Sequence, residues 1–229
     1  MGKIKFGSFI VDVRNKVGGQ VYSKNRGGAY VKNKVSPSQP RTSAQTTARA
    51  RLTTFAQGWR ALTATQQAAW NAAVGAYLKT DVFGDLKTPS GINLYSKLNI
   101  NLAQISVAAI VTPPLPIAVV GPATLTLTGA AGTPALSLAF TVSPVPTATN
   151  YIILATAQQS PGRFSVNSAF RILSTVAAAA TSPVNLLAAY NAKFGTLVAG
   201  QKVFIKVIPI STTTGIKGQG ITTSAIIAA

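Results

Sequence analysis

The sequence predicts an α+β protein, with a β-hairpin and a small helical unit followed by an antiparallel β-sandwich. Three observations lead to this class. The chain up to about residue 35 alternates as strands do, and residues 43–104 carry apolar side chains at helical spacing. Residues 124–229 hold short β-rich runs that turn signals separate. At 229 residues and 47% hydrophobic, the chain is large and apolar enough to bury a core.

Charge and proline content divide the chain into two parts. Residues 1–105 hold 15 of the 21 Lys and Arg residues and all three Asp residues, whereas the remainder has six basic residues and no acid. Prolines cluster at 113–116, and Pro122 follows. We therefore predict a basic hairpin and helical domain (1–105), a Pro-rich linker (106–123) and a sandwich (124–229).

The first predicted element is a hairpin over Gln20–Val35. Its alternating halves flank Asn25-Arg26-Gly27-Gly28, and paired glycines between β-branched and aromatic runs are a hairpin signal. If the turn preserves parity, one face of the hairpin is basic and aromatic and the other is aliphatic. The basic face would carry Tyr22, Lys24, Tyr30, Lys32 and Lys34, and the aliphatic face Val21, Val31 and Val35.

Three helices should follow. The first spans about 43–61 with an apolar stripe formed by Ala48, Leu52, Phe55, Trp59 and Leu62. The segment Thr63–Gln66 matches a capping box and opens a second helix, whose stripe would be Trp70, Val74, Tyr77 and Leu78. A loop over 80–86 comes next. With Thr88 as N-cap and Pro89 as the first helical residue, a third helix should reach about Gln104.

The last part reads as a sandwich. Its predicted strands are Thr124–Thr128, Leu136–Val142, Tyr151–Ala157, Phe170–Val176, Val203–Ile208 and Ile221–Ile227. Residues 185–193 are more helical in character. The stretch Ala139–Pro146, followed by Tyr151–Thr156, resembles fibronectin type III modules, which implies an immunoglobulin-like or fibronectin III-like sandwich.

The composition argues against an enzyme. The chain has no Glu, His or Cys, and its only side-chain carboxylates are Asp12, Asp81 and Asp85. General acid–base catalysis runs mostly on His, Glu and Asp, and zinc sites need Cys and His. A Ser–Lys hydrolase would need a motif such as S-x-x-K, which is missing. We expect no catalytic residue, no metal site and no cofactor.

A net charge of +18 predicts an anionic partner instead. The candidate contact residues are Lys24, Arg26, Lys32, Lys34, Arg49 and Arg51. The hairpin lysines also have a simpler interpretation, because lysines commonly protect exposed strand edges from aggregation. The partner could be DNA or an acidic protein surface. Sequence-specific readout is not expected, since the second predicted helix has no Lys or Arg before Lys79.

Four segments of the first hundred residues carry a family resemblance. They are Gly18–Val31 (GGQVYSKNRGGAYV), Trp59–Thr63 (WRALT), Gln67–Asn71 (QAAWN) and Pro89–Tyr95 (PSGINLY). This pattern resembles structural proteins encoded by tailed bacteriophages and prophages. The resemblance covers under half of the chain, implies no catalytic residue, and leaves capsid, neck and tail open as locations.

The resemblance implies a non-enzymatic virion protein of the minor capsid, cement or head–tail connector type. Its partners would be capsid, portal or tail subunits, with packaged DNA as a further partner and no membrane, in a ring-shaped, icosahedral or other homo-oligomeric assembly. The expected location is the virion, with the host cytoplasm as the alternative. Two other functions stay open: a non-specific DNA-binding protein, and an adhesive decoration module whose sandwich binds host glycans or proteins.

Overall fold

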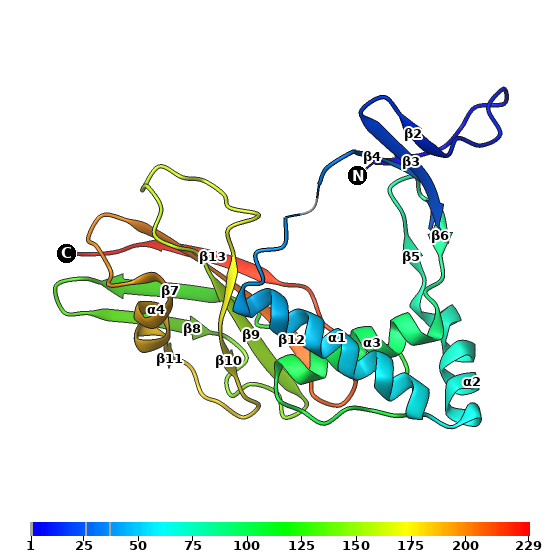
Figure 1. Ribbon diagram of the computed structural model, residues 1–229. Helices are drawn as coiled ribbons and strands as arrows, with labels where there is room; N and C mark the ends of the chain where they lie inside the picture. The colour runs from blue at the N-terminus through cyan, green and yellow to red at the C-terminus, as the bar shows by residue number, and fades with distance from the viewer. Residues whose placement is uncertain (1, 26, 37) are drawn as a thin grey trace.

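The predicted α+β architecture is present in the computed structural model, which describes residues 2–25, 27–36 and 38–229 (Figure 1). A small N-terminal sheet stands on the β5–β6 hairpin at one end of the molecule. Helices form the middle, and the C-terminal sheets form the other end. The chain between the N-terminal sheet and the first helix has no strand or helix among its described residues.

The predicted hairpin is the centre of a larger N-terminal sheet. Its strands are β1 (Gly2–Ile4), β2 (Asn15–Val17), β3 (Gln20–Asn25) and β4 (Gly28–Asn33), in the order β1-β4-β3-β2. All neighbouring strands are antiparallel. The β3–β4 hairpin confirms the prediction. The strands β1 and β2 were not predicted, because segments of three residues are too short to show an alternating pattern.

The predicted division into a basic and an aliphatic face is wrong. Val21 lies opposite Lys32, and Tyr22 lies opposite Val31. Residues directly opposite each other in an antiparallel pair share a face. The two residues between Asn25 and Gly28 join an odd-numbered position to an even-numbered one, so parity is not preserved. Each face therefore mixes lysine with apolar residues.

The helical unit follows the predicted order. It contains α1 (Ser43–Ala61), α2 (Ala64–Ala73), the 3-10 helix η1 (Val74–Tyr77), the short strands β5 (Lys79–Thr80) and β6 (Leu86–Lys87), and α3 (Gly91–Gln104). The capping box is confirmed, with Thr63 as N-cap and Gln66 bonding back to it. The predicted cap of α3 is wrong: Ser90, rather than Thr88, accepts from the backbone N–H of Asn93.

Only part of the predicted apolar stripes is buried. Phe55, Trp59, Leu62, Val74 and Tyr77 pack on a core of Trp70, Leu94, Tyr95 and Leu98. Tyr95 contacts the second half of α1, where its ring lies 5.7 Å from that of Trp59. The first half of α1 extends past this contact, so Ala48 and Leu52 are exposed. Leu78 is exposed as well, because the helical stretch ends at Tyr77.

The C-terminal part is an antiparallel sandwich. Its elements are β7 (Leu125–Ala130), β8 (Ala135–Phe140), β9 (Thr149–Ala155), β10 (Arg171–Val176), β11 (Val184–Asn185), α4 (Leu187–Phe194), β12 (Lys202–Ser211) and β13 (Ile221–Ile226). One sheet has the order β10-β9-β12-β13 and the other β11-β8-β7. The predicted strands and the helical segment are confirmed, with ends that differ by at most three residues; the two-residue strand β11 was not predicted.

Helix α3 packs directly on the sandwich. Leu102 and Ile105 form a buried cluster with Ile152 and Ile210 from the sheet. The amide of Asn101 donates to the carbonyl of Gly215, 2.9 Å away in the β12–β13 connection. A Cβ on Gly215 would lie 2.4 Å from the carbonyl oxygen of Leu98. Glycine is therefore what allows this turn to approach the helix so closely.

The Pro-rich segment 106–123 has no helix or strand, and helical side chains bind its backbone. The indole N–H of Trp70 donates to the carbonyl of Val111 at 2.8 Å, and the Tyr77 hydroxyl donates to that of Pro114 at 2.7 Å. The buried Asn99 amide accepts from the Ile110 N–H and donates to its carbonyl. These bonds fix the path of the segment against the helical unit.

Candidate anion-binding surface

The N-terminal sheet is basic and has no buried core of its own. Among residues 2–25, 27–36 and 38–42, every side chain is exposed or half-buried. The same residues include eight Lys or Arg and a single acid, Asp12. A small sheet normally gains its stability from a buried hydrophobic face. This sheet is therefore suited to present charge to a partner.

Two ion pairs hold the sheet on the hairpin below it. The Lys3 ammonium lies 2.9 Å from the Asp81 carboxylate, and the Lys5 ammonium lies 3.0 Å from that of Asp85. Lys5 also stands 5.3 Å from the centre of the Phe83 ring, in a cation–π arrangement. The hydrogen bond from Lys3, with backbone N–H bonds from Phe83 and Asp85, lowers the pKa of Asp81 to about 2.

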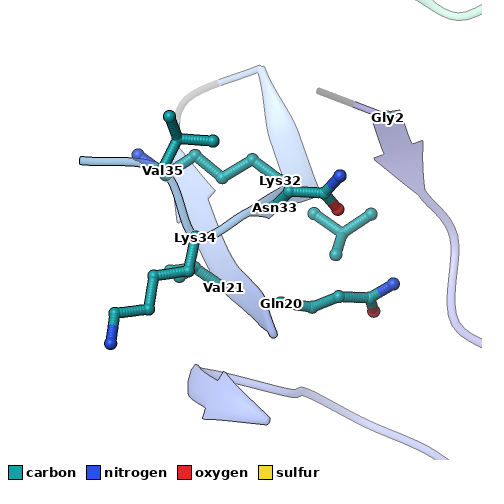
Figure 2. Close-up of a pocket in the computed structure, with 8 residues that line it drawn as sticks. Gly2, Gln20, Val21, Lys32, Asn33, Lys34 and Val35 are labelled. Carbon is teal, nitrogen blue, oxygen red and sulfur yellow. The ribbon is translucent and has the colours of Figure 1, made fainter. Parts of the chain in front are cut away.

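A first hollow lies at the end of β3 and β4 and has a volume of about 660 Å³. Figure 2 shows Lys32, Asn33, Lys34 and Val35 following one another along its wall, with Gln20 and Val21 beside them. Its lining contains two ammonium groups and two side-chain amides, but no carboxylate among the described residues. Ammonium and amide N–H groups donate hydrogen bonds, so this lining favours an anion.

A second hollow, of about 360 Å³, lies along β3. Its lining consists of Arg14, Asn15, Tyr22, Ser23, Lys24 and Asn25. Arg14 is bound to Asp12 at 2.7 Å, which leaves Lys24 as the cation without an ion-pair partner within the described lining. The hydroxyl and amide groups around it are of the kinds that contact phosphate oxygens in nucleic-acid complexes.

The predicted contact residues do not form one site. Lys32 and Lys34 line the first hollow, and Lys24 lines the second. Arg26 lies outside the described residues. Arg49 and Arg51 are on α1, which lies along α3 in the helical unit and apart from the N-terminal sheet (Figure 1). Neither arginine lines the hollows that contain the hairpin lysines, so the sheet carries the candidate surface.

Sequence reasoning missed several residues of this surface. Arg14 lines the second hollow, and Gln20 and Asn33 supply the amides of the first. Lys16 lies opposite Val21, which in turn lies opposite Lys32, so one face carries a lysine on each side of Val21. Only the register of β2 against β3 reveals this row, and nothing in the spacing of Lys16 predicts it.

Two other kinds of feature bear on function in the described chain: metal sites and membrane-spanning helices. Within the described ranges, no group of three or more potential His, Cys, Asp or Glu ligands comes together. None of the helices in this part of the chain is both long and apolar enough to cross a bilayer. No protein-family model matches the sequence, and no curated protein matches it.

Proposed function

We propose that this chain is a non-enzymatic virion structural protein of the minor capsid, cement or head–tail connector type. Its N-terminal sheet docks onto an anionic partner, and the sandwich contacts neighbouring subunits. The observation that carries the proposal is a basic sheet without a single buried side chain among its described residues. Partner binding would supply the burial and the countercharge that this sheet lacks.

Three further features support the proposal. The sequence segments Gly18–Val31 and Pro89–Tyr95 resemble those of tailed-phage structural proteins. The chain holds almost none of the side chains used in acid–base catalysis. The contact between α3 and the sandwich is buried, with Leu102 and Ile210 fully enclosed. A rigid body that carries a docking element at one end suits a protein that joins subunits.

The proposal is tested with particles from the host that encodes the chain. Particles purified on a density gradient are washed at high salt, and the chain is quantified by mass spectrometry. We expect it to remain with capsid, portal or tail subunits. A triple charge reversal, Lys24→Glu, Lys32→Glu and Lys34→Glu, should weaken retention because it makes the first hollow negative and removes the net positive charge of the second.

The matched control reverses three exposed cations elsewhere, with Arg60→Glu, Arg163→Glu and Arg171→Glu. The control carries the same net charge as the triple variant and should be retained like the natural chain. If the natural chain is missing from gradient-purified particles, the structural role is wrong. If both triple variants are retained equally well, the role of the N-terminal sheet as the docking element is wrong.

A further inference from the structure

Lysines continue from the N-terminal sheet onto the β5–β6 hairpin. Lys24 of β3 and Lys87 of β6 line the same hollow, of about 230 Å³, together with the ion pairs that Lys3 and Lys5 make with Asp81 and Asp85. Lys87 lies directly opposite Lys79 in the β5–β6 pair. Opposite residues have Cβ atoms about 4.5–5.5 Å apart, and like charges in such positions repel each other. The lysines of these two strands thus extend the positively charged surface from the sheet towards the helices.

The same line continues over α3 to the sandwich. Lys79 lies close enough to Lys97 of α3 for its positive charge to lower the pKa of Lys97. Gln104 lies two turns beyond Lys97 on the same side of α3, about 10 Å along the axis. There its side-chain oxygen accepts from Lys217, at 2.7 Å. We call the set Lys24, Lys87, Lys79, Lys97 and Lys217 the lysine ridge.

Along the ridge, positive charge is largely uncompensated. Of its members, only Lys87 lies within 4 Å of a carboxylate in the described residues, 3.8 Å from Asp85, and Asp85 already pairs with Lys5 at 3.0 Å. Desolvation lowers the pKa of Lys97, and the nearby ammonium groups of Lys79 and Lys217 lower it further. Adjacent like charges cost free energy in the isolated protein, and a bound anion would recover that cost.

We propose that the lysine ridge binds duplex DNA along its phosphate backbone, in a sequence-independent manner. This inference rests on the proposed function, because it names the anionic partner. The five lysines of the ridge lie on the N-terminal sheet, the β5–β6 hairpin, α3 and the β12–β13 connection, and the carboxylates nearest to them, Asp81 and Asp85, pair with Lys3 and Lys5. A duplex carries one negative charge per about 1.7 Å of its length, so it can neutralise all of these positions at once.

Other occupants fit the ridge less well. A second copy of this chain would be repelled, because its net charge is +18. An acidic protein surface normally intersperses charges of both signs, whereas four of the five ridge lysines have no carboxylate within 4 Å among the described residues. Within the ridge, the directly opposite Lys79 and Lys87 lie closer together than the Debye length, which is about 10 Å at 0.1 M salt. Its lysines therefore act together on a polymer of continuous negative charge.

The test measures binding of the full-length chain to a duplex of about 30 base pairs across a salt series. The ridge variant combines Lys79→Gln, Lys97→Gln and Lys217→Gln, which leaves every residue of the N-terminal sheet in place. The control combines Arg60→Gln, Arg163→Gln and Arg171→Gln, three exposed cations that are not part of the ridge. Both variants lose three positive charges.

We expect the ridge variant to show a log–log salt slope shallower by up to about 2.7, since each phosphate contact contributes about 0.9. The control should keep the natural slope. Removing like charges relieves repulsion, so the ridge variant should melt no lower than the natural chain, which separates lost binding from unfolding. Equal slopes for the ridge variant and the natural chain, or equal losses in both variants, would overturn the ridge.

The DNA inference and the proposed function can fail separately. If the natural chain does not bind the duplex at physiological salt, the DNA inference is wrong. Retention of the same chain in washed particles would then indicate that its positive charge contacts an acidic protein subunit. If the chain binds the duplex through the ridge but is missing from particles, the virion role is wrong and the DNA contact stands.

Discussion

Lys3 and Asp81 are 78 residues apart in sequence, and their side chains meet at 2.9 Å. The pair joins the first strand of the N-terminal sheet to the loop of the β5–β6 hairpin. The Asp81 side chain is only 6% exposed, whereas the Lys5–Asp85 pair beside it is more open to solvent. Because the sheet has no buried core, this pair is a principal link between the sheet and the rest of the molecule.

We predict that Asp81→Asn loosens the N-terminal sheet without unfolding the body. Asparagine keeps an oxygen that can accept the loop N–H groups of Phe83 and Asp85, but it loses the charge that binds Lys3. Amide hydrogen exchange should become faster in β1 and β4 and stay unchanged in β9 and β12. The control is Asp12→Asn, because Asp12 pairs only with the nearby Arg14 in the described chain. Unchanged exchange in β1 would contradict the prediction.

Acidic pH should loosen the N-terminal sheet as Asp81→Asn does. The pKa of Asp81 falls from 3.8 to about 2 in the folded protein, mainly because Lys3 donates to it. A carboxylate with a lowered folded pKa contributes stability above its unfolded pKa and loses it as pH falls through the folded value. We therefore expect the sheet to loosen between about pH 4 and about pH 2. Exchange rates in β1 measured across this range test the prediction, and Asp81→Asn should remove most of the pH dependence.

Gly215→Ala should destabilise the contact between α3 and the sandwich. Gly215 has φ +69°, and an added Cβ would lie 2.4 Å from the Leu98 carbonyl oxygen. Gly200 has a similar φ of +78° with no atom within 4 Å of such a Cβ. Gly200→Ala thus measures backbone strain alone, about 1–2 kcal/mol. Thermal melting should show a larger loss for Gly215→Ala, and equal losses would contradict the close approach.

Asn99→Ala should release part of the segment 106–123. The substitution removes the acceptor of the Ile110 N–H and the donor to its carbonyl. A buried polar group left without a partner costs about 1–3 kcal/mol, so denaturant unfolding should show a loss of that order. Asn93→Ala, at an exposed position of the same helix, is the control and should change stability little. A loss of equal size in the control would show that the bonds to Ile110 are not responsible.

Much of the fold follows from local patterns in the sequence. The capping box at Thr63 and the apolar residues Trp59 and Trp70 place the helices, because caps and helical spacing act within a few residues. The sandwich strands are long enough to show their turn boundaries. The mistaken cap at Thr88 shows the limit of such patterns: Ser90 offers the same hydroxyl chemistry two residues later and is the residue that caps α3.

The candidate surface depends on contacts that a linear pattern does not contain. The register of the β3–β4 hairpin pairs odd-numbered residues of β3 with even-numbered residues of β4. Lys32 therefore lies on the same face of the sheet as Val21 and Lys16. The lysine ridge joins Lys87, Lys97 and Lys217, which are separated by up to 130 residues and lie on different elements. Their charge is visible in the sequence. Their alignment arises only when α3 packs between the β5–β6 hairpin and the sandwich.

The connection between β4 and α1 has a consequence for how the N-terminal sheet behaves once its ion pairs open. Ten residue steps separate Asn33 from Ser43, so the sheet stays within about 35 Å of the start of α1. A short covalent tether of this kind holds the detached sheet at a local concentration on the order of millimolar near its own hairpin. Recapture therefore competes with any external ligand, and only a partner that makes many simultaneous contacts can keep the sheet away.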